Sequence, residues 1–246
     1  MIPKTAGKIL EEEEIRAFLK CPQFYKRGGI FRPSFEVRVL KKTVEYTIIK
    51  ALRSKLKDPL KDIHSLFLRC IIQENSMEGL LENQLKAFTV QGTLWLNKFF
   101  AILPLGLYFP VLGRITPVHI VSKTPVRLDI SAVLRSTKNQ TLHLLSFSPY
   151  YDVDNMEKDP INIWKLYSLQ DFVGLHPRSG RPQTKLHLLT FNTQNNLKYT
   201  SLDSNDLTEK RIAFSKSVIK SMESGFSYPL LPCPYPRCSY RNICGF

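Results

Sequence analysis

The sequence predicts a mixed α+β fold, because segments with helical periodicity and segments with strand periodicity follow one another along its 246 residues. Mostly helical segments come first, a pair of strands joined by a polar turn lies in the middle, and helix and strand segments complete the chain. Hydrophobic residues make up 43% of the sequence and charged residues 23%, which is typical of a globular protein with a substantial core.

The first half of the chain is expected to be mainly helical. Residues 8–20 carry an apolar stripe, and Pro22 then breaks or kinks this helix. The other segments expected before the middle of the chain are helices over 35–57, 62–73 and 77–100 and a strand-like region with turns over 109–121.

The second half is expected to be built around a sheet. Residues 126–134 and 141–148 both favour strands, and the polar residues between them predict a hairpin turn. The remaining expected elements are a helix over 162–173, a hairpin of strands over 185–191 and 197–200, and a final helix over 208–223.

These segments predict one domain with three regions. They are a mainly helical part over residues 1–108, a sheet core over 109–225 and a cysteine-rich metal-binding tail over 226–246. The chain opens with a run of glutamates rather than an apolar leader, and prolines interrupt its most apolar stretch, 99–112. We therefore expect an intracellular protein of the cytoplasm, nucleoid or nucleus that is not secreted and has no membrane partner.

The net charge of +14, from 35 Lys and Arg against 21 Asp and Glu, favours a polyanionic partner. Nucleic acid, and DNA in particular, is the partner that we expect, because binding phosphates releases counterions. The alternative is a basic but merely soluble surface. The residues expected to contact nucleic acid are Lys26, Arg27, Arg178, Arg181, Arg237 and Arg241.

Four cysteines form the most specific pattern in the chain. Cys21 lies near its start, and Cys233, Cys238 and Cys244 fall within twelve residues near its end. In a reducing compartment such a group is more often a set of metal ligands than a pair of disulfides, and four thiolates suit either zinc or a four-iron cluster. Four unrelated buried thiols are the alternative. Cys70, in the middle of an expected helix, is predicted to be a core residue.

The residues around these cysteines resemble the RecB-like branch of the PD-(D/E)XK nuclease superfamily, and especially its members with an iron–sulfur staple, such as the AddB nuclease subunit and CRISPR-associated RecB-like exonucleases. The similar segments are Cys21-Pro22-Gln23-Phe24-Tyr25, the tail from Cys238 to Cys244, and the hairpin that carries Asp129. The spacing from Cys233 to Cys238 is wider by two residues than the usual CxxC of the family. The resemblance implies a restriction-endonuclease-like core, a mixed central sheet flanked by helices, and a 4Fe–4S cluster rather than zinc on the four cysteines that joins the two ends of the chain.

The same resemblance implies that most of the catalytic site is degenerate. Asp129 matches the first metal-binding aspartate, whereas Ser146 stands where the second carboxylate belongs and Ser148 where a lysine belongs. No histidine occurs near residues 44–47, and the helix after the hairpin keeps only Tyr167 of its usual Gln-x-x-x-Tyr. Serine hydroxyls are poor ligands for Mg²⁺ or Mn²⁺, so neither metal is expected at this site.

We therefore expect a pseudoenzyme: a degenerate nuclease-fold, iron–sulfur protein that binds DNA or scaffolds a replication, recombination or repair assembly with a helicase or nuclease. One alternative is an active metal-dependent DNA exonuclease or endonuclease whose second carboxylate is displaced, to Asp152, Asp154 or Glu36. The other is a protein–protein adaptor or inhibitor that mimics a recombination nuclease.

The remaining titratable groups are expected to be structural or to lie on the surface. The glutamates from Glu11 to Glu14 are interpreted as a charge run at a helix start, where the helix dipole favours them. His143 and His187 both precede a Leu-Leu pair in an expected strand and are expected to face away from the core. The histidines treated as structural or surface residues are His64, His119, His143, His176 and His187.

Overall fold

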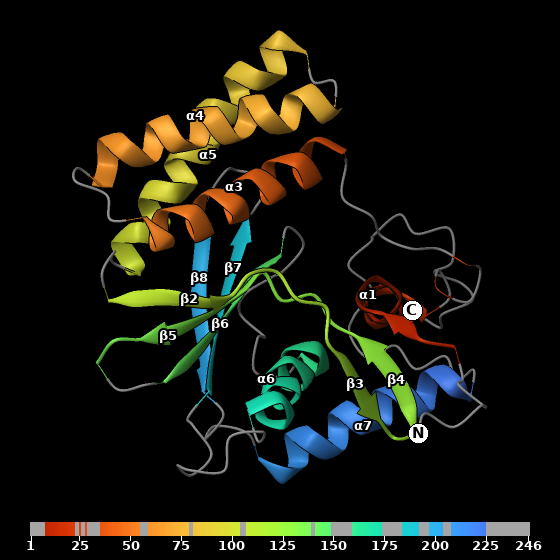
Figure 1. The fold of residues 1–246 in the computed structure, drawn as a ribbon. Helices are drawn as coiled ribbons and strands as arrows, with labels where there is room; N and C mark the ends of the chain where they lie inside the picture. Colours follow the sequence, from red (N-terminus) through yellow and green to blue (C-terminus); the bar gives the residue numbers. More distant parts are fainter. Residues whose placement is uncertain are drawn as a thin grey trace.

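A computed structural model describes residues 8–22, 25, 28, 35–54, 59–78, 81–103, 107–138, 141–148, 159–173, 184–191, 197–203 and 208–224. The helices are α1 (Glu12–Lys20), α3 (Phe35–Arg53), α4 (Pro59–Glu78), α5 (Glu82–Ile102), α6 (Pro160–Val173) and α7 (Glu209–Glu223). The strands are β1 (Leu10–Glu11), β2 (Tyr108–Leu112), β3 (Val118–Val121), β4 (Thr124–Arg127), β5 (Ala132–Ser136), β6 (Leu142–Ser148), β7 (Thr184–Phe191) and β8 (Leu197–Asp203). The expected α+β class with a mixed sheet flanked by helices is confirmed (Figure 1).

The larger sheet has the strand order β2-β5-β6-β7-β8. The predicted hairpins are both present, because β5 pairs antiparallel with β6, and β7 pairs antiparallel with β8. Strands β6 and β7 are parallel, so the chain must cross over between them, and α6 lies within this crossover. The sheet is therefore mixed, with a helix connecting its central parallel pair.

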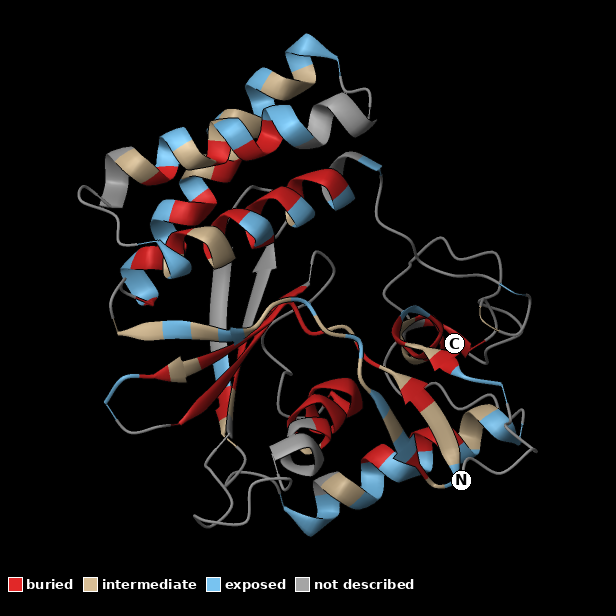
Figure 2. Ribbon diagram, viewed as in Figure 1, coloured by how far each residue is buried: buried red, intermediate tan, exposed pale blue. Residues whose placement is uncertain are grey.

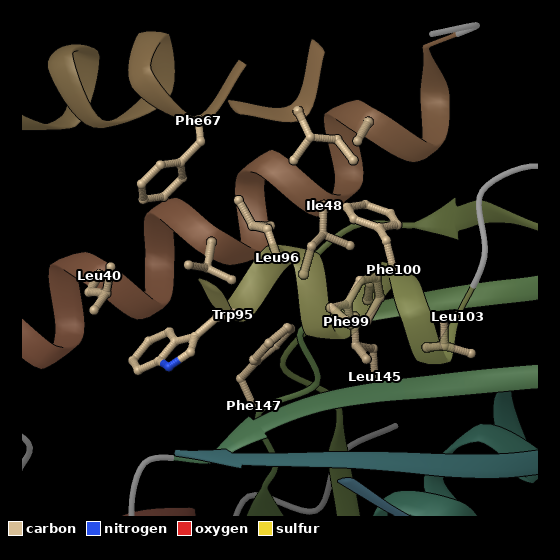
Figure 3. Close-up of a cluster of buried hydrophobic side chains, with 14 of the residues drawn as sticks. Leu40, Ile48, Phe67, Trp95, Leu96, Phe99, Phe100, Leu103, Leu145 and Phe147 are labelled. Atoms are coloured by element: carbon tan, nitrogen blue, oxygen red, sulfur yellow. The ribbon is translucent and has the colours of Figure 1, made fainter. Parts of the chain in front are cut away.

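Helices cover both faces of this sheet. The group α3, α4 and α5 packs on one face, and α6 packs on the other (Figure 1). Alternate residues of β5 divide accordingly, since Ala132 and Leu134 belong to the core under α3–α5 while Val133 belongs to the core under α6. Figure 3 shows the first of these cores, in which the rings of Trp95, Phe99 and Phe147 lie between the helices and the sheet.

Helices α4 and α5 approach each other closely at a glycine. A Cβ atom on Gly92 would lie 2.0 Å from the Cζ atom of Phe67, whose side chain is completely buried. Gly92 therefore gives the space that the Phe67 ring fills, and this explains a glycine in a helix interior, where it costs about 1 kcal/mol relative to alanine.

The smaller sheet has the order β1-β4-β3 and packs beside α1, α6 and α7. Strands β3 and β4 form a hairpin with the two-residue turn Ser122-Lys123, in which both φ angles are positive, at 50° and 75°. Two positive φ angles match the twist of a tight hairpin. The core at this sheet combines Leu10, Ile15, Phe18, Val121, Val126, Leu128, Ile161, Trp164, Val218 and Ile219.

Two expected elements differ from the observed ones in kind, and others differ in their bounds: the helix expected over residues 77–100 is observed over Glu82–Ile102. The helix expected over residues 8–20 begins at Glu12, because Leu10 and Glu11 pair as a short strand with β4. The single strand expected over residues 126–134 is divided into β4 and β5. Between them Leu128 donates its N–H to the carbonyl of Pro117, at 2.9 Å, and Ile130 pairs with Ile115. The chain therefore bends from one sheet to the other at Leu128–Ile130, with Asp129 at the centre of the bend.

The expectation that His143 and His187 face away from the core is wrong. Their side chains are 6% and 3% exposed, and their rings stack with centroids 4.7 Å apart. A nitrogen of one ring hydrogen-bonds a nitrogen of the other, which we call the histidine pair, and the ring of Tyr108 packs edge-on against His143. Burial lowers the pKa of His143 to about 4 and that of His187 to about 3, so both rings are neutral at physiological pH.

Exposed and buried stretches alternate along the helices, as expected for helices that pack on one side (Figure 2). Within the described part of the chain, no helix is both long enough and apolar enough to cross a membrane.

Candidate functional site

Asp129, which the resemblance matches to a metal-binding aspartate, is bound by two cations at the bend between the sheets. Nζ of Lys41, from α3, lies 3.1 Å from one carboxylate oxygen, and Arg114 binds both oxygens through Nε and Nη2, at 2.9 and 3.2 Å. Burial by itself would raise the pKa of Asp129, but the charges of Lys41, Lys165 and Arg114 outweigh this effect and lower it. Asp129 is therefore a carboxylate already neutralised by side chains of the protein.

A second buried ion pair lies beside Asp129. Nζ of Lys165, from α6, lies 3.0 Å from the Glu12 carboxylate and donates a hydrogen bond of 2.9 Å to Oγ of Ser146. Glu12 also accepts a bond from Nε of Arg16, at 2.9 Å, and one from the backbone N–H of Asp129, at 2.9 Å. The side chain of Lys165 is only 1% exposed, so its ammonium group depends on these oxygens for the hydrogen bonds that water would otherwise provide.

These contacts decide the protonation of Glu12. Burial would raise its pKa, but Arg16, Lys165 and the backbone N–H of Asp129 together lower it to about 2. Burial lowers the pKa of Lys165, although Glu12 acts in the opposite direction. Opposite charges a hydrogen-bond length apart in a buried setting hold each other ionised, and this pair ties α1 to α6.

Two further carboxylates extend the cluster. Glu45, one turn after Lys41 on α3, lies 3.6 Å from Nζ of Lys41 and accepts a hydrogen bond from the Ser131 hydroxyl. Asp159 caps α6 by accepting the N–H of Ile161 at 2.9 Å, and its other oxygen lies 3.6 Å from Nη1 of Arg16. Burial raises the pKa of both Glu45 and Asp159, because each carboxylate loses water on folding.

We call this group the ion network. Its members are the carboxylates Glu12, Glu45, Asp129 and Asp159 and the cations Arg16, Lys41, Arg114 and Lys165. Four negative and four positive groups cancel formally, so the whole surplus of +14 in the chain lies outside the network.

The network does not fit a divalent metal of the kind that the family resemblance would place at Asp129. Mg²⁺ requires several hard oxygen ligands in a near-octahedral arrangement, and carboxylates are usually among them. Here Ser146 offers a neutral hydroxyl that already accepts a hydrogen bond from Lys165, and both oxygens of Asp129 are bound by cations. Among the residues that the structure describes, no three His, Cys, Asp or Glu side chains are grouped so that they could hold a metal ion.

The other expected site residues fall in different places. Ser146 joins the network through Lys165. Ser148 ends β6 opposite Thr190 of β7, and its side chain lies outside the described part. Tyr167, two residues after Lys165, stacks on His119 of β3 with ring centroids 6.4 Å apart.

The predicted cysteine site is described only at its first ligand. Cys21 is buried directly after α1, and its N–H caps that helix by bonding the carbonyl of Ala17 at 2.9 Å. Cys70 is 1% exposed in α4, so its prediction as a core residue is confirmed. The predicted residues outside the described part are Cys233, Cys238, Cys244, Lys26, Arg27, Arg178, Arg181, Arg237, Arg241, His176, Asp152 and Asp154, and Glu36 is described in its backbone alone. The four-cysteine cluster therefore stays a prediction.

The sequence reasoning missed most of the ion network, although two signals were available. Glu12 with Arg16 and Lys41 with Glu45 are oppositely charged pairs four residues apart, a spacing at which helical side chains meet. Lys165 lies in the stretch Ile161–Leu166, in which every residue is buried and Asn162 is the other polar residue. A lysine inside such a stretch indicates a buried charge that needs a carboxylate partner.

Comparisons with known proteins add little. No protein-family model matches the chain, and no curated protein matches it. Among solved structures, the chain is similar to one titled "Crystal structure of SSO0001", at 11% identity and a TM-score of 0.30 over 87% of this chain and 98% of that one. At this TM-score the match carries no inference about fold or function.

Proposed function

We propose that this protein is a catalytically degenerate member of the RecB-like nuclease fold that binds DNA or scaffolds a DNA-processing assembly. The observation that carries the proposal is the contact between Lys165 and Ser146. At the position where the resemblance requires a second metal-binding carboxylate, a neutral hydroxyl accepts a hydrogen bond from a buried ammonium group. At this site the ammonium group of Lys165 takes the place of the metal ion that nuclease chemistry would need.

The order of the elements supports the same proposal. Asp129 precedes β5, β5 and β6 form an antiparallel hairpin, and α6 leads to a strand parallel to β6. The resemblance implies an aspartate, a hairpin and a following helix in this order.

Charge supports DNA as the partner. The ion network is formally neutral, so the surplus cations lie elsewhere on the chain. The described cations with exposed side chains include Arg38, Lys42, Arg53, Lys98, Lys123, Lys138, Lys210, Lys216 and Lys220. Contacts of lysine and arginine with phosphates give affinity without sequence preference and weaken steeply as salt is added.

The proposal also includes a 4Fe–4S cluster on Cys21, Cys233, Cys238 and Cys244. Bound there, the cluster would act as a structural staple between segments that are far apart in sequence. The buried position of Cys21 at the end of α1 is compatible with this role, because a cluster thiolate is normally shielded from water.

Two assays test the proposal. Fluorescence anisotropy with labelled single-stranded and double-stranded DNA should show binding at low salt that falls linearly with the logarithm of the salt concentration. Incubation of labelled DNA with Mg²⁺ or Mn²⁺ should show no cleavage above that of Asp129→Ala. Absence of binding to both kinds of DNA at low salt would contradict the DNA role and favour the adaptor function.

One observation favours the active-nuclease alternative. Glu12 bonds the backbone of Asp129, and Glu45 shares Lys41 with the Asp129 side chain, so two carboxylates approach it from helices. In that case Glu12 would serve as the displaced second carboxylate. Metal-dependent cleavage by the wild type that is lost in both Asp129→Ala and Glu12→Gln would support this alternative and contradict the degenerate one.

A further inference from the structure

Helix α3 carries aromatic and basic side chains along one exposed face. Phe35, at the start of the helix, and Tyr46, in its middle, are both 37% exposed. Between and beyond them on the helix, Arg38, Lys42 and Arg53 are exposed and Lys50 is half-buried. We call this set the α3 stripe; its members are Phe35, Arg38, Lys42, Tyr46, Lys50 and Arg53.

The spacing of these residues puts them on one side of the helix. Successive members are three or four residues apart, and this spacing repeats the 3.6-residue turn from Phe35 to Arg53. The opposite side of α3 is buried on the sheet and on α4 and α5 through Val44, Ile48 and Ala51. The stripe therefore extends over almost the whole helix, about 27 Å at 1.5 Å per residue.

The acidic side chain that the structure describes on α3 lies away from the stripe. Glu45, the acidic side chain of α3 that the structure describes, is 5% exposed and turned into the ion network. Lys41 bonds Asp129 in the same network. Helix α3 thus turns Lys41 and Glu45 towards the ion network, while Arg38 and Lys42 are exposed on its outer face.

The C-terminal end of the stripe combines a ring with cations. Nζ of Lys50 lies 4.3 Å from the ring centroid of Tyr46, within the range of a cation–π contact. Arg69, an exposed residue of α4, is close enough to Lys50 to act electrostatically on it. Two or more cations beside an exposed ring form the arrangement that binds a phosphate and stacks the neighbouring base.

We propose that the α3 stripe is a binding track for single-stranded nucleic acid, in which Phe35 and Tyr46 stack bases and the four cations contact phosphates. This proposal rests on the proposed DNA role and names the surface that performs it. Single strands are favoured over duplex because only unpaired bases present their faces to rings. Ring stacking tolerates any base, so the track would bind without sequence preference.

The test compares wild type with two pairs of variants by anisotropy, using a labelled oligothymidine and a duplex of equal length. Arg38→Gln with Lys42→Gln removes two phosphate contacts, so single-strand affinity should fall about tenfold or more at low salt and the salt slope should become shallower by about 1 to 2. Phe35→Ala with Tyr46→Ala should lower single-strand affinity about tenfold or more, and duplex affinity much less.

The matched control is Lys86→Gln with Lys98→Gln on α5, which removes the same charge from another helix of the same face of the sheet. These lysines are exposed, and Lys86 forms an ion pair of 2.9 Å with the exposed Glu82, so the fold should be unaffected. Circular dichroism and thermal unfolding check that every variant is folded.

Each outcome has one meaning. Loss of single-strand affinity in both α3 double variants, but not in the α5 double variant, supports the track. Equal losses of affinity in the α3 and α5 double lysine or arginine variants, with no effect of Phe35→Ala with Tyr46→Ala, would overturn the track but not general DNA binding. A wild type that binds neither oligonucleotide at low salt would overturn both the track and the DNA role.

Discussion

Glu12→Gln measures how much the ion network contributes to folding. The pKa of Glu12 is lowered from 4.5 to about 2, and at 1.36 kcal/mol per pH unit this corresponds to about 3 kcal/mol of stability at pH 7. The folded-state pKa lies below the unfolded one, so this contribution is complete above pH 4.5 and disappears as the pH falls towards 2. Glutamine keeps the shape of the side chain but removes its charge and leaves the buried ammonium of Lys165 with one partner fewer, which adds to the cost.

Urea unfolding at pH 7 and pH 3 provides the assay. At pH 7, the free energy of unfolding of Glu12→Gln should be about 3–5 kcal/mol below that of wild type. At pH 3, ionisation of Glu12 should contribute only about 1 kcal/mol to the stability of wild type, so the difference should be smaller. Glu13→Gln is the matched control, because Glu13 is its exposed neighbour in the same turn of α1. Equal stability of the two variants at pH 7, or a difference that does not shrink at pH 3, would refute the reasoning.

Three other expectations concern packing, titration and the cysteine site. Gly92→Ala should cost about 1–3 kcal/mol by urea unfolding, because its Cβ would lie 2.0 Å from the Phe67 ring, and the cost should disappear in a Phe67→Ala background. Replacing both members of the histidine pair by leucine should make the loss of stability between pH 6.5 and pH 4 shallower, since neutral buried rings gain protons only on unfolding. Protein purified without oxygen should be brown and contain iron that Cys21→Ala loses and Cys70→Ala keeps; equal iron in both would contradict the cluster.

Local pattern was sufficient to predict most elements but not the bend that holds Asp129. Residues 126–134 alternate in part between apolar and polar and contain no turn residue such as glycine or proline, so they indicate one strand. In the fold, Leu128 enters the core beside the small sheet and Ile130 enters the core under α6. Leu128 and Ile130 are apolar because each enters a different core, and only the tertiary structure shows that these cores are separate.

The ion network could not be predicted from local sequence pattern for a related reason. Charged pairs four residues apart are usual on solvent-facing helix surfaces, and glutamates are usual in the first turn of a helix. Whether Glu12 is solvated or buried depends on α6 bringing Lys165 to it from 153 residues away. The Asp129 backbone N–H bonds Glu12 and the Ser146 hydroxyl bonds Lys165, so both residues lie at this ion pair. The resemblance contained no position for a lysine on the following helix.

Formal charges link Ser146 to the ion network. Lys165 with neutral Ser146 carries a net charge of +1, the same as a divalent cation with a carboxylate. The network can therefore keep its charge balance without a metal. The double substitution Lys165→Ala with Ser146→Asp removes one positive charge and adds one negative charge, so this variant should bind a divalent metal ion. In that variant Mn²⁺ at a hundredfold excess over its Kd should raise Tm by about 5–10 °C, while wild type and Lys165→Ala with Ser146→Asn should not respond. Glu12→Gln added to the double substitution should abolish the response, because it removes the carboxylate that Lys165 binds. A folded double variant with no response to Mn²⁺, or a wild type that responds equally, would show that Lys165 does not stand in for a metal.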